Sequence, residues 1–185
     1  MNVLFTASEA VERSGGLKMR PGIYSAALFN GVTKEGTWYD VNYGNSDGQV
    51  IHKRLFKPEP TNPKDGEKPE DTIRRKGFQN MVHLTHLVKL FLGPEVLNSI
   101  KGDYFSVMDS LMGMLNSQKG RKVNLKVIPD SDGVYSDLPF SPSNYVELHE
   151  PDVEPTLKFN KTELERFKVP AASGGGPVTG GNVNV

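Results

Sequence analysis

The chain of 185 residues contains no cysteine. It therefore has no disulfide bond, no Cys-ligated zinc and no thiol nucleophile, and nothing in it requires an oxidising compartment. No apolar stretch approaches the roughly 20 residues of a membrane-spanning helix. The first residues show no basic segment followed by a long apolar run, so no secretory signal is predicted. We expect a soluble, intracellular protein with no membrane partner.

An excess of charge of either sign is missing as well. The 22 Lys and Arg residues balance the 22 Asp and Glu residues, which argues against a histone-like polycation. The charges are nevertheless segregated along the chain. Basic residues cluster at 53–57, 74–76 and 119–126, whereas acids dominate from 130 to 154. A local basic groove is therefore compatible with zero net charge.

Glycine and proline are abundant, with 19 and 13 residues, and they divide the chain into short elements. Alternating and aromatic-rich segments predict strands at 22–29, 37–43, 49–57 and 121–128, and extended structure resumes at 134–135 and 145–149 as the last strand of five. Apolar residues at helical spacing predict two helices, at 73–92 and at 103–118, the second with Asp103 as its N-cap.

This order predicts a mainly β fold with a helical insertion (α+β). It is the order of a five-stranded OB-fold barrel with helices between strands 3 and 4, at about 72–119. A β-sandwich with a helical insertion would give a similar pattern. We place this domain at 21–150, after an N-terminal extension (1–20) and before an acidic connector with a short amphipathic segment (151–170). Residues 171–185 are Gly-rich and uncharged, which predicts a flexible tail.

The hairpin at 37–57 brings aromatic and basic residues together. We take the register in which Tyr43 pairs with Gln49. The outer face of the hairpin then carries Trp38, His52, Arg54 and Phe56. A slip of one residue would exchange the two faces. Single-stranded nucleic acid needs aromatic rings for its bases and cations for its phosphates, and the hairpin offers both. A buried face with solvated edge lysines would give the same pattern, because strands favour aromatic residues in general.

Candidate catalytic and metal-binding residues are few. His83 and His86 form an H-x-x-H pair, but no further ligand accompanies it, and structural or surface histidines explain it better. Asp130–Gly133 begins like a calcium loop and lacks the later ligands. No phosphate-binding or nucleophile motif occurs. We expect no metal, no cofactor and no enzymatic activity. A small hydrolase or nuclease using carboxylates such as Asp40 or Asp137 is the weakest alternative.

Two segments, MVHLTHLVKLF at 81–91 and KVNLKVIPDSDGVYSDLPFSPSNYVELHE at 122–150, resemble the later half of bacteriophage single-stranded DNA-binding proteins of OB-fold type. In such proteins a helical stretch precedes a Lys-containing strand, a turn, a Tyr-containing strand, a Pro-rich bend and a strand ending in acidic residues. The segment GIYSAALFNGVTKEGTWYDVNY at 22–43 is similar to their first two strands.

The resemblance implies a protein that coats and protects single-stranded DNA in phage replication or recombination, largely independently of sequence, in the host cytoplasm. Its partners would be single-stranded DNA, with RNA left open, and phage or host replication proteins. Residues and resemblance together predict a nucleic-acid-binding set of Trp38, Tyr43, His52, Lys53, Arg54, Phe56, Arg74, Arg75, Lys122, Lys126 and Tyr135.

One alternative function stays open from the sequence. A virion structural or assembly protein would use the same β-rich body as an interaction module. The Gly-rich tail and the balanced charge suit that role equally. The oligomeric state stays open in both cases.

Overall fold

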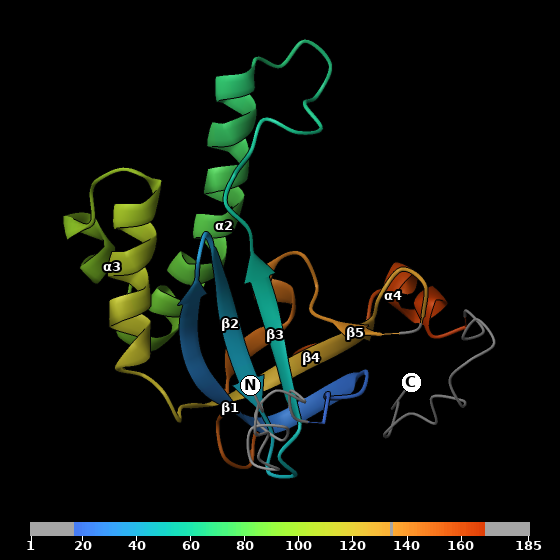
Figure 1. The fold of residues 1–185 in the computed structure, drawn as a ribbon. Coiled ribbons are helices and arrows are strands. Elements are labelled where there is room, and N and C mark those ends of the chain that lie inside the picture. The colour runs from blue at the N-terminus through green and yellow to red at the C-terminus, as the bar shows by residue number, and fades with distance from the viewer. Residues whose placement is uncertain (1–16, 134, 169–185) are drawn as a thin grey trace, which may run out of the picture.

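The computed structural model describes residues 17–133 and 135–168, and this part of the chain has a mixed α+β architecture (Figure 1). Its strands form a six-stranded antiparallel sheet: β1 (Gly22–Glu35), β2 (Trp38–Gly44), β3 (Val50–Leu55), β4 (Lys122–Pro129), β5 (Ser136–Asp137) and β6 (Val146–Leu148). Its helices are α2 (Pro69–Leu92), α3 (Tyr104–Asn116) and α4 (Lys161–Arg166), with 3-10 turns η1 (Glu95–Ser99) and η2 (Pro142–Asn144).

The long strand β1 organises the sheet because it has two successive partners. Its first half pairs with β4 and its second half with β2, which gives the order β3-β2-β1-β4-β5, with β6 also on β4. The register shifts between Tyr24 and Ala27 and again between Phe29 and Gly31, on either side of the change of partner. Such bulges bend a strand, and Figure 1 shows β1 turning sharply from one partner to the other.

The sheet is open between β3 and β5. The α+β class and the helices between the third and fourth strands are confirmed, whereas a closed five-stranded barrel is not, since no ladder joins β3 to β5 among the described residues. Strand β5 has only two residues, and Pro139 soon follows it. The Lys53 side chain spans this gap instead, because its Nζ donates to Asp137 Oδ1 at 3.3 Å and to the Leu138 carbonyl at 2.8 Å.

Helices α2 and α3 cover the sheet and share one hydrophobic core with it. The second half of α2 is the part that packs, through the buried side chains of Leu84, Leu87, Val88 and Phe91. The first half of α2 projects away from the sheet together with the segment that precedes it (Figure 1). Proline at the first position favours the start of α2, and α3 begins where Asp103 accepts a hydrogen bond from the backbone of Ser106 at 3.0 Å, as predicted.

The packed body begins before residue 21. The backbone of Val50 bonds to Leu17 at 2.8 Å and to Met19 at 3.0 Å, and the Met19 side chain is completely buried. The end of the predicted N-terminal extension is therefore part of the core. The rest of that extension and the predicted tail at 171–185 lie outside the described residues.

A prediction concerns Asn116, the last residue of α3. Beyond the stretch of β1 that pairs with β4, the backbone of Val32 bonds to a side chain on that edge. Asn116 accepts the Val32 N–H through Oδ1 at 2.8 Å and donates through Nδ2 to the Val32 carbonyl at 3.0 Å. Replacing Asn116 with Ala leaves these buried groups without a partner and should destabilise the protein by about 1–3 kcal/mol. Urea denaturation measures the loss. The exposed Asn98 provides the control, and an equal effect of Asn98→Ala would contradict the proposed role of Asn116.

Candidate nucleic-acid interface

The hairpin of β2 and β3 pairs two residues away from the predicted register. Tyr43 pairs with Ile51, and Asp40 pairs with Arg54. The reason lies in the turn, where Asn45 Oδ1 accepts the backbone N–H groups of Asp47 and Gln49 at 3.1 and 2.9 Å and tightens the connection. A shift of two residues preserves the alternation of faces. The outer face therefore keeps Trp38, His52, Arg54 and Phe56, and the predicted core residues Val41, Ile51 and Leu55 are buried.

On this outer face, Trp38, Arg54 and Asp40 form a stacked group. The Arg54 guanidinium binds the Asp40 carboxylate through two hydrogen bonds of 2.9 and 2.7 Å, and its Cζ lies 5.0 Å from the centroid of the Trp38 ring. The hydrogen bonds to Asp40 raise the pKa of Arg54 above its ordinary value. Trp38 Nε1 is buried and has no hydrogen-bond partner among the described residues. In this group the Arg54 guanidinium therefore stacks on the Trp38 indole, and the Asp40 carboxylate balances its charge.

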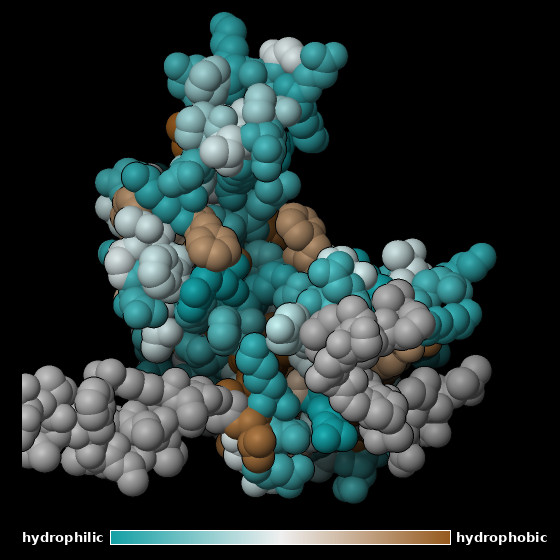
Figure 2. All heavy atoms as spheres, turned by 45° about the vertical axis from the view of Figure 1, so that its right-hand side comes forward, coloured by the Kyte–Doolittle hydropathy of each residue, from teal (hydrophilic) through white to brown (hydrophobic). Residues whose placement is uncertain are grey.

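Two hollows adjoin along β3. The first, the β3–β5 hollow, measures about 380 Å³ and is lined by Lys18, His52, Lys53, Ser136 and Asp137 besides β3 residues. The second, the β3–α2 hollow, measures about 350 Å³ and is lined by Lys57, Lys76, Gln79, His83 and Phe140, among others. Arg54 and Phe56 line both hollows, so the two hollows are adjacent along β3, and we refer to them together as the trough. Figure 2 shows the face turned toward the viewer as mainly hydrophilic, with hydrophobic side chains scattered singly over it.

Three large aromatic rings on or beside the trough face solvent. Phe56 and Tyr135 are each 63% exposed, and Phe140 is 69% exposed. The ammonium group of Lys18 lies 5.5 Å from the Tyr135 ring centroid. These three rings are therefore accessible to a ligand at the hollows.

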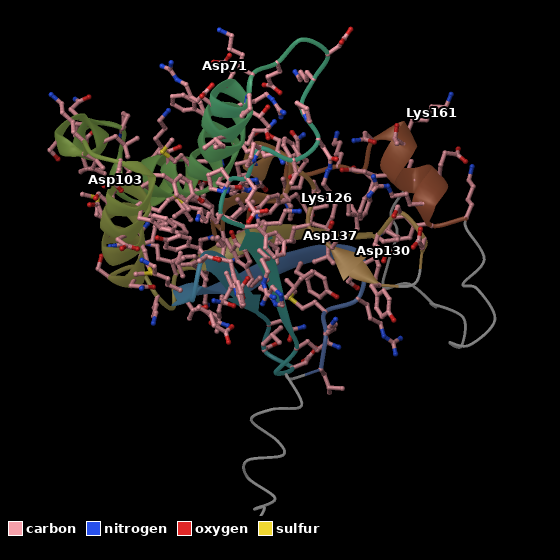
Figure 3. The ribbon with its side chains drawn as sticks, turned by 45° about the horizontal axis from the view of Figure 1, so that its top comes forward. Asp71, Asp103, Lys126, Asp130, Asp137 and Lys161 are labelled. Atoms are coloured by element: carbon pink, nitrogen blue, oxygen red, sulfur yellow. The ribbon has the colours of Figure 1, made fainter. Side chains whose placement is uncertain are left out.

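Two of the predicted contact residues are buried and do not belong to the interface. The Tyr43 ring packs in the core against Phe29 and Tyr145. The ammonium of Lys126 is buried too, and it donates to Glu163 at 2.9 Å. Figure 3 places Lys126 on β4 near α4. Alternation along β4 predicted a solvated face, but the segment carrying α4 covers that face.

The remaining predicted cations are dispersed or paired. Arg75 is bound to Glu67 at 2.8 Å, which holds the pKa of that carboxyl at about 2. Arg74 lies over Phe78 on the other side of α2, and Lys122 is exposed at the start of β4. None of these three lines the trough. Lys53 does line it, from the inner side of β3, and is bound to Asp137.

The trough also contains residues that the sequence analysis missed. These are Lys18, Lys57, Lys76, Gln79 and Phe140. For Phe140 a signal exists, since it stands between Pro139 and Ser141-Pro142, where a strand cannot continue, and a large ring in such a segment is a candidate for exposure. Lys57 directly follows β3 in the sequence, whereas Lys18, Lys76 and Gln79 become neighbours of β3 only through the fold.

The two histidines of the H-x-x-H pair differ in burial, since His83 is buried and His86 is half-buried. His83 stacks on Tyr145, with Nδ1 3.3 Å from the Tyr145 hydroxyl, and burial, followed by the charge of Lys53, lowers the pKa of His83 to about 4. Burial also lowers the pKa of His86. The described residues contain no group of three His, Asp or Glu side chains placed to hold a metal ion.

Comparison with protein-family models, with curated proteins and with solved structures found no match for this chain. Among the described helices, none has the length and apolar character needed to cross a membrane. The function is therefore inferred from the trough and its side chains.

Proposed function

We propose that the protein binds single-stranded DNA along the trough on β3. The observation that carries this proposal is the exposure of Phe56, Tyr135 and Phe140, each above 60%, next to a line of cations. Single-stranded binders combine stacking platforms for bases with a cationic track for phosphates. Lys18 and Lys57 are the cations at the trough that are best placed for the track, because the charge of Arg54 is already balanced by Asp40.

The sheet order supports the proposal. We propose that the fold is an OB-type barrel opened between β3 and β5, with Lys53 bridging the opening in place of a backbone ladder. In OB-folds the face of strands 2 and 3 binds oligonucleotides. The two hollows of the trough lie on β3, which is the third strand.

In this proposal the protein coats and protects single strands during phage replication or recombination in the host cytoplasm, without catalysis and largely without base readout. Phage or host replication proteins are the partners it would meet there. The nuclease alternative gains no support, because Asp40 and Asp137 are both ion-paired, to Arg54 and to Lys53.

A binding experiment tests the proposal. Trp38 is the single tryptophan, and the Arg54 guanidinium lies over its ring. Oligo-dT that binds beside this ring or displaces the guanidinium should therefore quench the Trp38 fluorescence at low salt. Quenching should fade as salt rises, and Lys57→Ala should make the salt dependence shallower by about 0.7 in log–log slope, the value for one single-strand phosphate contact. Lys101→Ala, which removes an exposed lysine from outside the trough, is the matched control. If oligo-dT causes neither quenching nor a mobility shift at low salt, the proposal is contradicted.

A separate surface favours the alternative of a virion structural or assembly protein. Helices α2 and α3 border an apolar groove of about 420 Å³, lined by Ile73, Phe78 and Met81, among others, and Phe78 is 53% exposed. If this groove is the functional surface, the protein should occur stoichiometrically in purified particles. Phe78→Ala should then abolish incorporation without changing any DNA binding.

A further inference from the structure

We propose that the β3–α2 hollow is a pocket for one unstacked nucleobase, seated between Phe56 and Phe140 with Gln79 at its edge. This inference rests on the proposed function and adds a discrete subsite to it. The subsite is built partly from the inserted helix α2, so it extends the contact surface beyond the β2–β3 hairpin.

The two phenylalanines line the same hollow and come from different segments of the chain. Phe56 comes from the end of β3 and Phe140 from the segment after β5, and both are more than 60% exposed. Within the described residues their rings do not contact each other; the ring that Phe140 meets is His83, edge-on at a centroid distance of 6.3 Å. A hollow of about 350 Å³ falls within the range of about 300–1,000 Å³ for small-ligand sites. A nucleobase bound between the Phe56 and Phe140 rings would cover apolar surface that water now contacts.

Hydrogen bonds fix the backbone at Phe56 and the loop at Thr61, two parts of the lining of the hollow. Asn80 Nδ2 donates to the Phe56 carbonyl at 2.6 Å and to the Tyr104 hydroxyl at 2.9 Å, which ties the end of β3 to α2 and α3. Lys76 Nζ donates to the carbonyl and hydroxyl oxygens of Thr61, at 2.6 and 2.8 Å, and fixes the loop on the other side. A pocket that is formed before binding loses less conformational entropy when a ligand enters.

The polar side chains at the hollow suit a base and its phosphate. Gln79 forms no hydrogen bond with any other described residue, and its amide offers both a donor and an acceptor. Such an amide can pair with the edge of any base, as is usual when single strands are bound with splayed bases. Lys57, which also has no partner among the described residues, supplies positive charge for a phosphate, while the Glu59 carboxylate, which also lines the hollow, is limited to accepting hydrogen bonds.

The test uses a short single strand with one 2-aminopurine, whose fluorescence falls when it stacks, moved through successive positions. We expect one position at which wild-type protein quenches the probe most strongly. Phe140→Ala or Phe56→Ala should abolish this quenching and weaken binding at least about fivefold. Phe140→Tyr should restore it. The matched control is Phe78→Ala, which removes another exposed phenylalanine, on α2 and outside the hollow, and should leave both readouts unchanged.

A second measurement separates direct stacking from a change in fold. An abasic nucleotide at the quenched position should weaken binding to the wild type as much as Phe140→Ala does, and should have no further effect on the Phe140→Ala variant. Tight binding that is insensitive to Phe56→Ala and Phe140→Ala would overturn the pocket and leave the proposed function intact. Absence of any single-strand binding at low salt would overturn both.

Discussion

Replacing Glu163 with Ala is expected to lower the free energy of unfolding by about 3–5 kcal/mol, because it leaves the Lys126 ammonium buried without its carboxylate. The two groups are 2.9 Å apart, and their side chains are only 3% and 7% exposed. Glu163 also accepts the backbone N–H of Asn160 at 2.8 Å, so the same carboxylate caps α4. The Lys158 carbonyl, at 2.9 Å from the ammonium, is too weak a partner to compensate for the lost charge.

Two further variants show whether burial is the cause of this effect. Glu165→Ala breaks the ion pair with Lys168, which is also 2.9 Å long but more than half exposed, and should change stability by at most about 1 kcal/mol. The double variant Lys126→Met with Glu163→Leu should recover most of the loss, because apolar side chains of similar size can replace a buried pair. Urea denaturation gives all of these values. Equal, small effects of Glu163→Ala and Glu165→Ala would show that α4 is held on β4 by other contacts.

The fold was predictable where local pattern decides it. Alternation predicts the outer and inner faces of β3, and Asp103 predicts the start of α3. The hairpin register was wrong because it depends on side-chain bonds of Asn45 within the turn. Strand β1 was expected to end at residue 29, since Asn30-Gly31 is typical of a turn. In the structure Gly31, with φ of +92°, forms a bulge and the strand continues.

The site was less predictable because long-range packing decides which side chains face water. Lys126 has the spacing of a solvated residue, and only the arrival of α4 buries it. Tyr43 shares its side of β2 with the core residue Val41, and its place in the predicted site came from the resemblance and not from alternation. Phe140 joins Phe56 at one hollow across a separation of more than 80 residues, which no local pattern reveals.

Lowering the pH from 7 to 4 is expected to remove about 3 kcal/mol of stability through His83 alone. Burial, with Lys53 nearby, lowers the pKa of His83 in the folded protein to about 4, whereas an unfolded histidine has a pKa of 6.5. The folded state therefore holds this ring neutral while the unfolded state takes up a proton. The contribution is complete above pH 6.5 and disappears as the pH falls toward 4, and the gap between the two pKa values corresponds to about 3 kcal/mol.

His83→Gln removes the titrating ring and keeps a polar group near the Tyr145 hydroxyl, now 3.3 Å from Nδ1. Carboxylates that titrate near pH 4 are common to both proteins, so the difference in unfolding free energy between wild type and variant isolates His83. That difference should shrink by about 3 kcal/mol between pH 7 and pH 4. The matched control is His52→Gln, which changes an exposed histidine and should give a profile parallel to the wild type. A parallel profile for His83→Gln would mean that protonation of His83 is tolerated in the fold, for example because Phe140 moves aside and admits water to the ring at the floor of the β3–α2 hollow.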